Sequence, residues 1–206
     1  MKVLLINGSP HEKGCTYTAL SLIAGELKAQ GIETEILHVG GQPVGGCIGC
    51  GGCRSGNGCV FGGVVNEAIE KAKTADAFVF GSPVHYASAA GNMASFMDRL
   101  AYAGGKYLAY KPAAVCCSAR RAGTTSTLDQ LVKYPQFFHM PLVNGSYWAM
   151  VHGANPEQVL QDAEGCAVMQ ELGRNMAWLL RCIEAGKAAG IDPPQNPPRP
   201  MTNFIR

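Results

Sequence analysis

Four cysteines lie close together in the chain, at a spacing suited to binding iron or another metal. Cys47, Cys50, Cys53 and Cys59 form a C-x₂-C-x₂-C-x₅-C pattern, and the five glycines between them let the backbone wrap around a compact ligand. Four thiolates in such a run can hold a [4Fe–4S] cluster. A zinc ion is an alternative, although structural zinc sites usually separate two C-x₂-C pairs by a longer stretch. Free or redox-active thiols in a glycine-rich loop are a third interpretation.

The segment from Asn7 to Thr16 has the composition of a phosphate-binding loop. It combines small residues and hydroxyls, and it precedes a helical pattern whose first N–H groups are free to bind an anion. The segment is neither G-x-G-x-x-G nor G-x-x-x-x-G-K-[ST], so it fits neither a dinucleotide nor a nucleoside triphosphate fingerprint. It therefore predicts a monophosphate ligand, and the plain alternative is a polar turn with Ser9 capping the helix.

Two further segments have the residue types needed to surround a flat ring. In the first, Pro83 stiffens a turn and Tyr86 offers a stacking face; in the second, hydroxyls, N–H groups and Gly123 can contact the polar edge of the ring. A planar ring with a monophosphate indicates FMN. The candidate ring-binding residues are Ser82, Pro83, Val84, His85, Tyr86, Ser118, Ala119, Arg120, Arg121 and Gly123.

Three charged or titratable side chains in these segments could take part in the function or could have only a structural or solvated role. His85 could donate a proton or contact substrate, but a lone loop histidine is more often solvated or held by structural hydrogen bonds. Arg120 and Arg121 could neutralise a reduced flavin or attract the phosphate of a nicotinamide cofactor, or they could simply be solvated. We expect no side-chain acid or base to be strictly required, because flavin performs the difficult chemistry itself.

The elements that must position these segments alternate along the chain. Apolar stripes at helical spacing, such as Leu20, Ile23, Ala24 and Leu27, separate short β-like runs, and Gly31 is suited to end the first helix. A last helix is predicted from about Pro156 to Ala185. The predicted strands are Lys2–Asn7, Glu33–Val39, Ala77–Gly81, Ala113–Cys117 and Leu142–Asn144 with its flanks.

This alternation predicts an α/β fold: a flavodoxin-like, doubly wound, five-stranded parallel sheet of strand order 2-1-3-4-5, with helices on both faces. We expect one FMN-binding domain over residues 1–190, with a cysteine-rich loop at 45–63. Five of the twelve prolines lie between Asp192 and Pro200, so residues 191–206 are expected to form an extended C-terminal arm. Such an arm could be disordered or could lie along a second subunit and cover Met201, Phe204 and Ile205.

Composition narrows the classes of partner. The 17 Lys and Arg residues against 15 Asp and Glu residues give a net charge of +2, and no basic run exceeds Arg120-Arg121, so nucleic acid is not an expected partner. The apolar opening Val3–Ile6 is too short for a membrane helix or a signal peptide. We therefore expect no membrane association and a cytoplasmic location, where nine cysteines indicate metal, cluster or redox chemistry.

Five segments of the chain together resemble the NADPH-dependent FMN reductase and iron–sulfur flavoprotein family. They are Val3–Pro10, Gly81–Tyr86, Phe96–Arg99, Arg120–Thr124 and Thr202–Arg206. The resemblance implies a flavodoxin-like fold, non-covalent FMN and a homodimer or homotetramer with the flavin near a subunit interface. It also implies that Ser9, Gly14, Cys15 and Thr16 hold the phosphate, and that Pro83–Tyr86 and Ser118–Gly123 surround the isoalloxazine. His11 stands where the family usually has arginine, and Cys15 where it usually has Asn or Ser, which bears on phosphate affinity.

Three functions follow from these residues. The first is an FMN-dependent oxidoreductase that passes electrons from NAD(P)H to a quinone, a flavin or another small acceptor. The second is an electron carrier in which a [4Fe–4S] cluster at Cys47–Cys59 feeds FMN from a ferredoxin-like donor. The third is a flavin-binding redox sensor whose cysteine loop changes state on oxidation.

Overall fold

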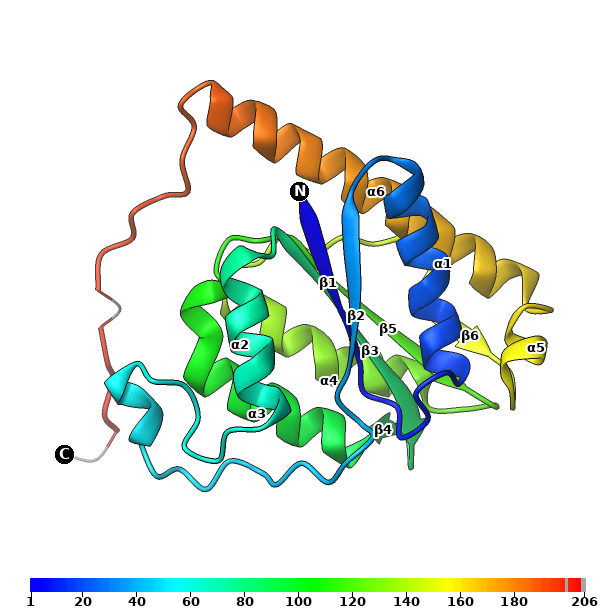
Figure 1. The fold of residues 1–206 in the computed structure, drawn as a ribbon, viewed down its shortest axis with the longest axis horizontal. Coiled ribbons are helices and arrows are strands. Elements are labelled where there is room, and N and C mark those ends of the chain that lie inside the picture. The colour runs from blue at the N-terminus through cyan, green and yellow to red at the C-terminus, as the bar shows by residue number, and fades with distance from the viewer. Residues whose placement is uncertain (199, 205–206) are drawn as a thin grey trace.

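The computed structural model describes residues 1–198 and 200–204, and it contains a parallel sheet with helices on both faces (Figure 1). The parallel strands run in the order β2-β1-β3-β5-β6, while β4 pairs antiparallel with the end of β3. Numbering only the parallel strands along the chain gives 2-1-3-4-5, so the predicted strand order is confirmed. The strands are β1 (Lys2–Asn7), β2 (Glu33–His38), β3 (Ala77–His85), β4 (Ser88–Ala89), β5 (Ala113–Ala119) and β6 (Met150–His152).

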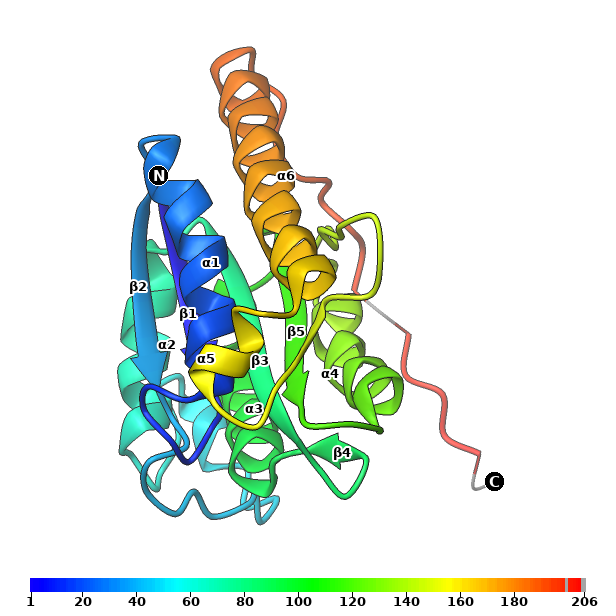
Figure 2. The same ribbon diagram turned by 90° about the vertical axis from the view of Figure 1, so that its right-hand side faces the viewer.

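Two layers of helices cover the sheet (Figure 2). Val3 and Leu5 of β1 face one layer, and Leu4 and Ile6 face the other, so all four are buried and the strand is a continuous apolar run. The first layer contains α1 (Cys15–Ala29), α5 (Pro156–Val159) and α6 (Ala163–Ala188). The second contains α2 (Val64–Thr74), α3 (Gly91–Gly104) and α4 (Thr124–Phe137). Two short 3₁₀ turns are η1 (Gly52–Ser55) and η2 (Gly105–Tyr107).

The end of α1 has the predicted geometry. Gly31 has a φ of +75°, its N–H donates to Lys28 O, and the next N–H, from Ile32, donates to Leu27 O. These bonds satisfy carbonyls that the end of a helix leaves free, and they turn the chain into β2.

The predicted position of the fifth strand is wrong. Leu142 makes a single parallel bridge to Ala113, and the strand itself is Met150–His152, paired with the end of β5. Residues 144–148 leave the sheet between these two contacts, so one edge strand is split into two short pieces. An edge strand has only one neighbouring strand and needs no long apolar run. The prediction relied on such runs, so it could not locate this strand.

The single helix predicted from Pro156 to Ala185 is also wrong, because it is two helices. The side chain of Asn155 caps α5, and the chain then breaks before Asp162 caps α6 by accepting a hydrogen bond from Gly165 N at 2.9 Å. The second cap satisfies a free N–H at the start of α6 and lets that helix take its own direction along α1.

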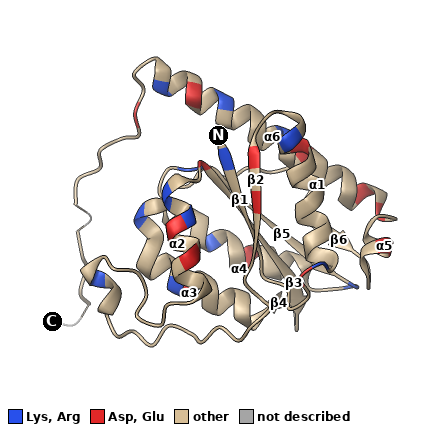
Figure 3. Ribbon diagram, in the orientation of Figure 1, with Lys and Arg blue, Asp and Glu red and all other residues tan. Residues whose placement is uncertain are grey.

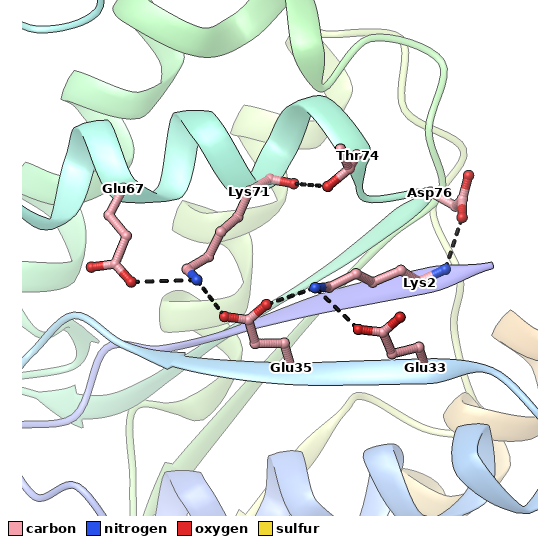
Figure 4. A network of polar contacts seen from close by, with 7 residues as sticks. All are labelled: Lys2, Glu33, Glu35, Glu67, Lys71, Thr74 and Asp76. Atoms are coloured by element: carbon pink, nitrogen blue, oxygen red, sulfur yellow. Dashed lines mark hydrogen bonds and ion pairs between the residues drawn. The ribbon is translucent and has the colours of Figure 1, made fainter.

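A network of ion pairs joins the amino ends of β1 and β2 to α2 (Figure 4). Lys2 Nζ lies 2.9 Å from Glu35 Oε2, and Lys71 Nζ lies 2.6 Å from Glu35 Oε1. Hydrogen bonds from Lys71 and Lys2 hold the pKa of Glu35 below its ordinary value. The network lies at the edge of the sheet opposite the candidate loops, so it supports the fold and not the site.

The C-terminal segment is extended after α6. Asn196 Nδ2 donates to Tyr110 Oη at 2.6 Å, and Met201 and Phe204 are 83% and 91% exposed. The predicted arm also includes Arg199, Ile205 and Arg206, which lie outside the described residues. Among the helices described, none is long and apolar enough to span a bilayer.

Gly173 allows α6 to pack closely on α1, and its replacement should destabilise the protein. A Cβ at this position would lie 2.8 Å from Ile23 O and 2.8 Å from Glu26 Cβ. We expect Gly173→Ala to lower the free energy of unfolding by about 1–3 kcal/mol. Gly25→Ala, on the exposed side of α1 with nothing within 4 Å, should raise it by about 0.5–1 kcal/mol. Urea denaturation measures both, and an equal effect of the two substitutions would contradict this account of the packing.

Candidate functional site

The loops singled out in the sequence meet at the carboxyl edge of the sheet. The strands are parallel, so the ends of β1, β3 and β5 lie side by side (Figure 1). Gly8 N donates to Gly81 O at 2.9 Å, and Thr16 Oγ1 lies 2.8 Å from Ser118 Oγ. The first bond joins the loops after β1 and β3, and the second joins α1 to the end of β5, so the three loops form one connected surface.

Asn7, the last residue of β1, organises the loop that follows. Its side chain is fully buried; Nδ2 donates to Glu12 O at 2.9 Å, and Oδ1 accepts from Ser9 N at 3.1 Å. Ser9 Oγ then accepts from His11 N at 3.1 Å. The hydroxyl of Ser9 therefore holds the loop in shape, while the His11 side chain is exposed.

The start of α1 is suited to bind a phosphate. Gly14 is the N-cap residue and makes no side-chain capping bond, and Cys15 and Thr16 occupy the first two helical positions. The N–H groups of the first turn have no partner within the helix, and the positive end of the helix dipole lies at the same point. The Cys15 thiol points elsewhere: Sγ donates to Gly153 O at 3.6 Å, and burial raises its pKa. An anion bound at this point would therefore be held by the backbone of Cys15 and not by its side chain.

A pocket of about 560 Å³ lies between the loops after β3 and β5, and several predicted ring-binding residues line it. Tyr86 is fully exposed, with a φ of +49°, so its ring is free to stack on a ligand. Gly123 has a φ of +96°, and a Cβ there would lie 2.7 Å from Ala87 Cα, so glycine is required where the two loops touch. The predicted residues that share this pocket are Val84, Tyr86, Ala119, Arg120, Arg121 and Gly123.

The remaining predicted residues are close by but outside that pocket. Ser82 is fully buried, and its hydroxyl accepts from Ala90 N and donates to Pro83 O, so it fixes the turn after β3. His85 is exposed and pairs with Ser88 in β4. Ser118 is buried and its hydroxyl bonds to that of Thr16.

The four cysteines line a second pocket, of about 350 Å³. Cys47, Cys50, Cys53 and Cys59 come from the loop between β2 and α2, and the third of them, Cys53, lies within η1. Gly51 and Gly56, at the two ends of η1, have φ values of +72° and +84°, which provide the reversals the wrap requires. Arg99, Phe61 and Tyr102 line the same pocket.

The donor set of this pocket is four cysteine thiols, the set that both a [4Fe–4S] cluster and a structural zinc site can use. The described residues contain no group of three or more His, Cys, Asp or Glu side chains placed to hold one metal ion. A zinc ion needs every sulfur within about 2.3 Å of one point. A [4Fe–4S] cluster takes four thiolates, one on each iron atom, so a pocket lined by four cysteines has the donors that such a cluster needs.

Two contacts place the beginning of the cysteine loop against the phosphate loop, and Asn92 then joins it to α3. His38 Nε2 lies 2.7 Å from Ser9 O, and a Cβ on Gly40 would lie 2.2 Å from the same oxygen. Asn92 at the start of α3 donates to Gly40 O and Gln42 O and accepts from Val44 N. The beginning of the cysteine loop is thus packed on the loop that follows β1.

Three residues that organise these sites were not among the predicted binding residues, namely Asn7, Asn92 and Arg99, although Asn7 begins the predicted phosphate loop and Arg99 ends the Phe96–Arg99 segment. Arg99 is 6% exposed and donates from Nε to Cys59 Sγ at 3.2 Å. Its position next to the apolar stripe of α3 was the available signal, because a charged residue at the border of a buried face often bonds to a loop packed there.

The sheet order and the loops at its carboxyl edge define a flavodoxin-like protein with a candidate FMN site. A family model described as NADPH-dependent FMN reductase matches residues 1–155, and the chain belongs to that family of flavin-dependent oxidoreductases. An iron–sulfur flavoprotein of Methanocaldococcus jannaschii is 28% identical over 192 residues, covering 89% of this chain and all of the relative.

Solved structures agree on the fold. A flavodoxin from the domain Archaea matches with a TM-score of 0.60 and 14% identity over 88% of this chain and 99% of that one. An NADH:FMN oxidoreductase in its apo form matches with a TM-score of 0.61 and 19% identity over 88% and 89% of the two chains. The predicted flavodoxin-like fold is therefore confirmed, and the family model that matches residues 1–155 confirms the predicted family.

Replacing Asn7 should weaken FMN binding, because the loop then loses both hydrogen bonds of this buried side chain. We expect Asn7→Ala to raise the FMN dissociation constant about tenfold, equivalent to about 1.4 kcal/mol. Fluorescence titration of apoprotein with FMN measures it, with Asn57→Ala at an exposed position as the control. Unchanged affinity in Asn7→Ala would show that this loop does not hold the phosphate.

Proposed function

We propose that this protein is an FMN-dependent oxidoreductase that exchanges electrons between FMN and a [4Fe–4S] cluster held by Cys47, Cys50, Cys53 and Cys59. The observation that carries the proposal is that these four side chains line one pocket on a loop packed against the candidate phosphate loop. The relative from Methanocaldococcus jannaschii, matched over its full length, is named an iron–sulfur flavoprotein, which supports the same assignment.

The residues at the carboxyl edge would bind and orient FMN. The N–H groups at the start of α1 would bind its phosphate, and Tyr86 with the backbone of residues 119–123 would contact its ring. When bound, FMN accepts electrons singly or as a hydride, so it can link one-electron and two-electron partners. Arg120 and Arg121, exposed beside the ring pocket, would offset negative charge on a reduced ring.

The proposed donor is a ferredoxin-like protein that reaches the cysteine pocket, and the acceptor is a small molecule at the ring pocket. Cys47 and Cys50 are exposed, so a protein donor can approach this end of the site. We also propose that the chain assembles as a homodimer or homotetramer.

A second candidate function is hydride transfer from NAD(P)H to FMN, with a quinone, a flavin or another small acceptor taking the electrons. The open ring pocket and the two exposed arginines beside it favour this function, because a nicotinamide phosphate carries negative charge. Anaerobic reduction distinguishes the two: rapid bleaching by NADPH supports the reductase, and reduction only by a low-potential protein donor supports the carrier.

Iron analysis of cysteine variants tests the proposal. Purified anaerobically, the wild type should show flavin absorbance with a broad brown shoulder and about four irons and four sulfides per chain. Cys59→Ser should lose most of the iron and sulfide and keep its FMN. Cys182 is an exposed cysteine on α6 outside this pocket, so Cys182→Ser is the matched control. It should keep its iron and sulfide as well as its FMN. Flavin absorbance in the wild type with neither iron nor sulfide would refute the cluster.

Replacing His85 tests whether the chemistry depends on the cofactor alone. We expect His85→Ala to keep FMN and to lower turnover by no more than about tenfold, because orientation and electrostatics are the protein's share. The test is to measure steady-state turnover and FMN content on the same sample of His85→Ala. Complete loss of turnover with FMN still bound would make His85 a required proton donor.

A further inference from the structure

Arg99 is a buried charge without a carboxylate partner. Its side chain is 6% exposed, and none of the ion pairs among the described residues includes it. The adjacent Asp98 instead accepts a hydrogen bond from Tyr134 Oη at 2.6 Å. The loop over residues 40–63 has Arg54 as its only charged residue and contains no Asp or Glu (Figure 3). A buried cation in such surroundings is costly unless an anion compensates it.

The guanidinium of Arg99 is directed at the cysteine loop. Nε donates to Cys59 Sγ at 3.2 Å, Nη2 donates to Gly62 O at 3.0 Å, and Nη1 donates to Gly45 O at 3.4 Å. The ring of Phe61 lies beneath it, with its centroid 5.4 Å from Cζ. Gly45 precedes the first cysteine and Gly62 follows the last, so one side chain on α3 joins both ends of the loop.

The bond to sulfur indicates which anion compensates the charge. Arginine has five donors and no acceptor, so Sγ must accept the bond. A thiolate bonded to iron carries negative charge and accepts such a bond more strongly than a neutral thiol does. Hydrogen bonds to the sulfurs and local charge are among the factors that set the reduction potential of an iron–sulfur cluster.

We infer that Arg99 is the positioning residue of the cysteine site: its buried guanidinium closes the loop over residues 45–62 and raises the reduction potential of the group held there. This inference rests on the proposed function, since it requires a cluster on the four cysteines. Arg99 touches Cys59, and it acts on the cluster through that sulfur and through its charge.

Redox titration of reconstituted variants tests the inference. With Arg99→Gln, the ratio of reduced to oxidised cluster at a fixed potential should fall about tenfold, a shift of about 59 mV to more negative potential for one electron. Arg99→Lys keeps the charge but loses the planar set of donors, so its shift should be smaller than that of Arg99→Gln. Arg54→Gln removes an exposed charge from the same loop, and solvent screening should make its effect smaller still. Arg181→Gln on α6 should leave the potential unchanged.

Hydrogen exchange on the iron-free protein provides a readout that does not need the cluster. Arg99→Gln should accelerate exchange over residues 45–63, because both carbonyl bonds are lost, and Arg181→Gln should not. If Arg99→Gln cannot retain a cluster, Arg99→Lys still reports the potential and hydrogen exchange still reports the closure of the loop.

The outcomes separate this inference from the proposed function. A wild type without iron after reconstitution refutes the proposed cluster and this inference with it. A wild type with four irons, together with an Arg99→Gln variant of unchanged potential, overturns the inference and leaves the proposed function standing. Equal shifts in Arg99→Gln and Arg54→Gln would also overturn it, because the buried position would then have no special effect.

Discussion

The reversal of strand order between β1 and β3 is the constraint on which the rest of the structure depends. The chain leaves β1 toward α1 on one face of the sheet and leaves β3 toward α3 on the other face. Their loops therefore separate at the carboxyl edge, where open α/β sheets bind their ligands. The bond from Gly8 N to Gly81 O holds the two loops together at their bases, so the separation begins immediately beyond it.

The cysteine loop uses the same edge in a different way. It leaves β2 and, instead of turning directly into α2, runs across the loop after β1, where His38 and Gly40 contact Ser9. Two residues of α3 then hold this loop. Asn92 bonds to Gly40 at its beginning, and Arg99 bonds to Gly45 and Gly62 on either side of the cysteines. Two candidate sites of different chemistry therefore lie on the same sheet and its loops. A fixed separation between them suits electron transfer better than a mobile linker would.

Much of the fold could be predicted from the sequence, because central strands buried on both faces are continuous apolar runs. Lys2–Asn7 has the predicted bounds, and the next three predicted strands have the predicted first residues. The fifth strand could not be found this way, since its two pieces at Leu142 and Met150–His152 are too short to form a pattern. The break before α6 depends on a cap at Asp162 within a segment whose periodicity continues on both sides.

The candidate loops were also predictable, but the partners of individual side chains were not. Gly, Ser, Pro and Thr after a strand mark a ligand-binding loop, and the structure brings these loops together. That the hydroxyls of Thr16 and Ser118 bond to each other, 102 residues apart, follows only from the packing. Cys116 and Cys117 are buried as the strand pattern implied, and burial raises the pKa of Cys117 to about 12. Cys182, on α6, is exposed.

In the proposed function, electrons reach FMN through the cysteine pocket. Stopped-flow mixing with a reduced low-potential protein donor, comparing wild type and Cys59→Ser at equal FMN content, tests it most directly. The account predicts fast flavin reduction in the wild type and reduction at least about tenfold slower in Cys59→Ser, a difference of about 1.4 kcal/mol in the barrier. Equal rates in the two proteins would contradict it, and would show that the donor reaches the flavin without the cysteine site.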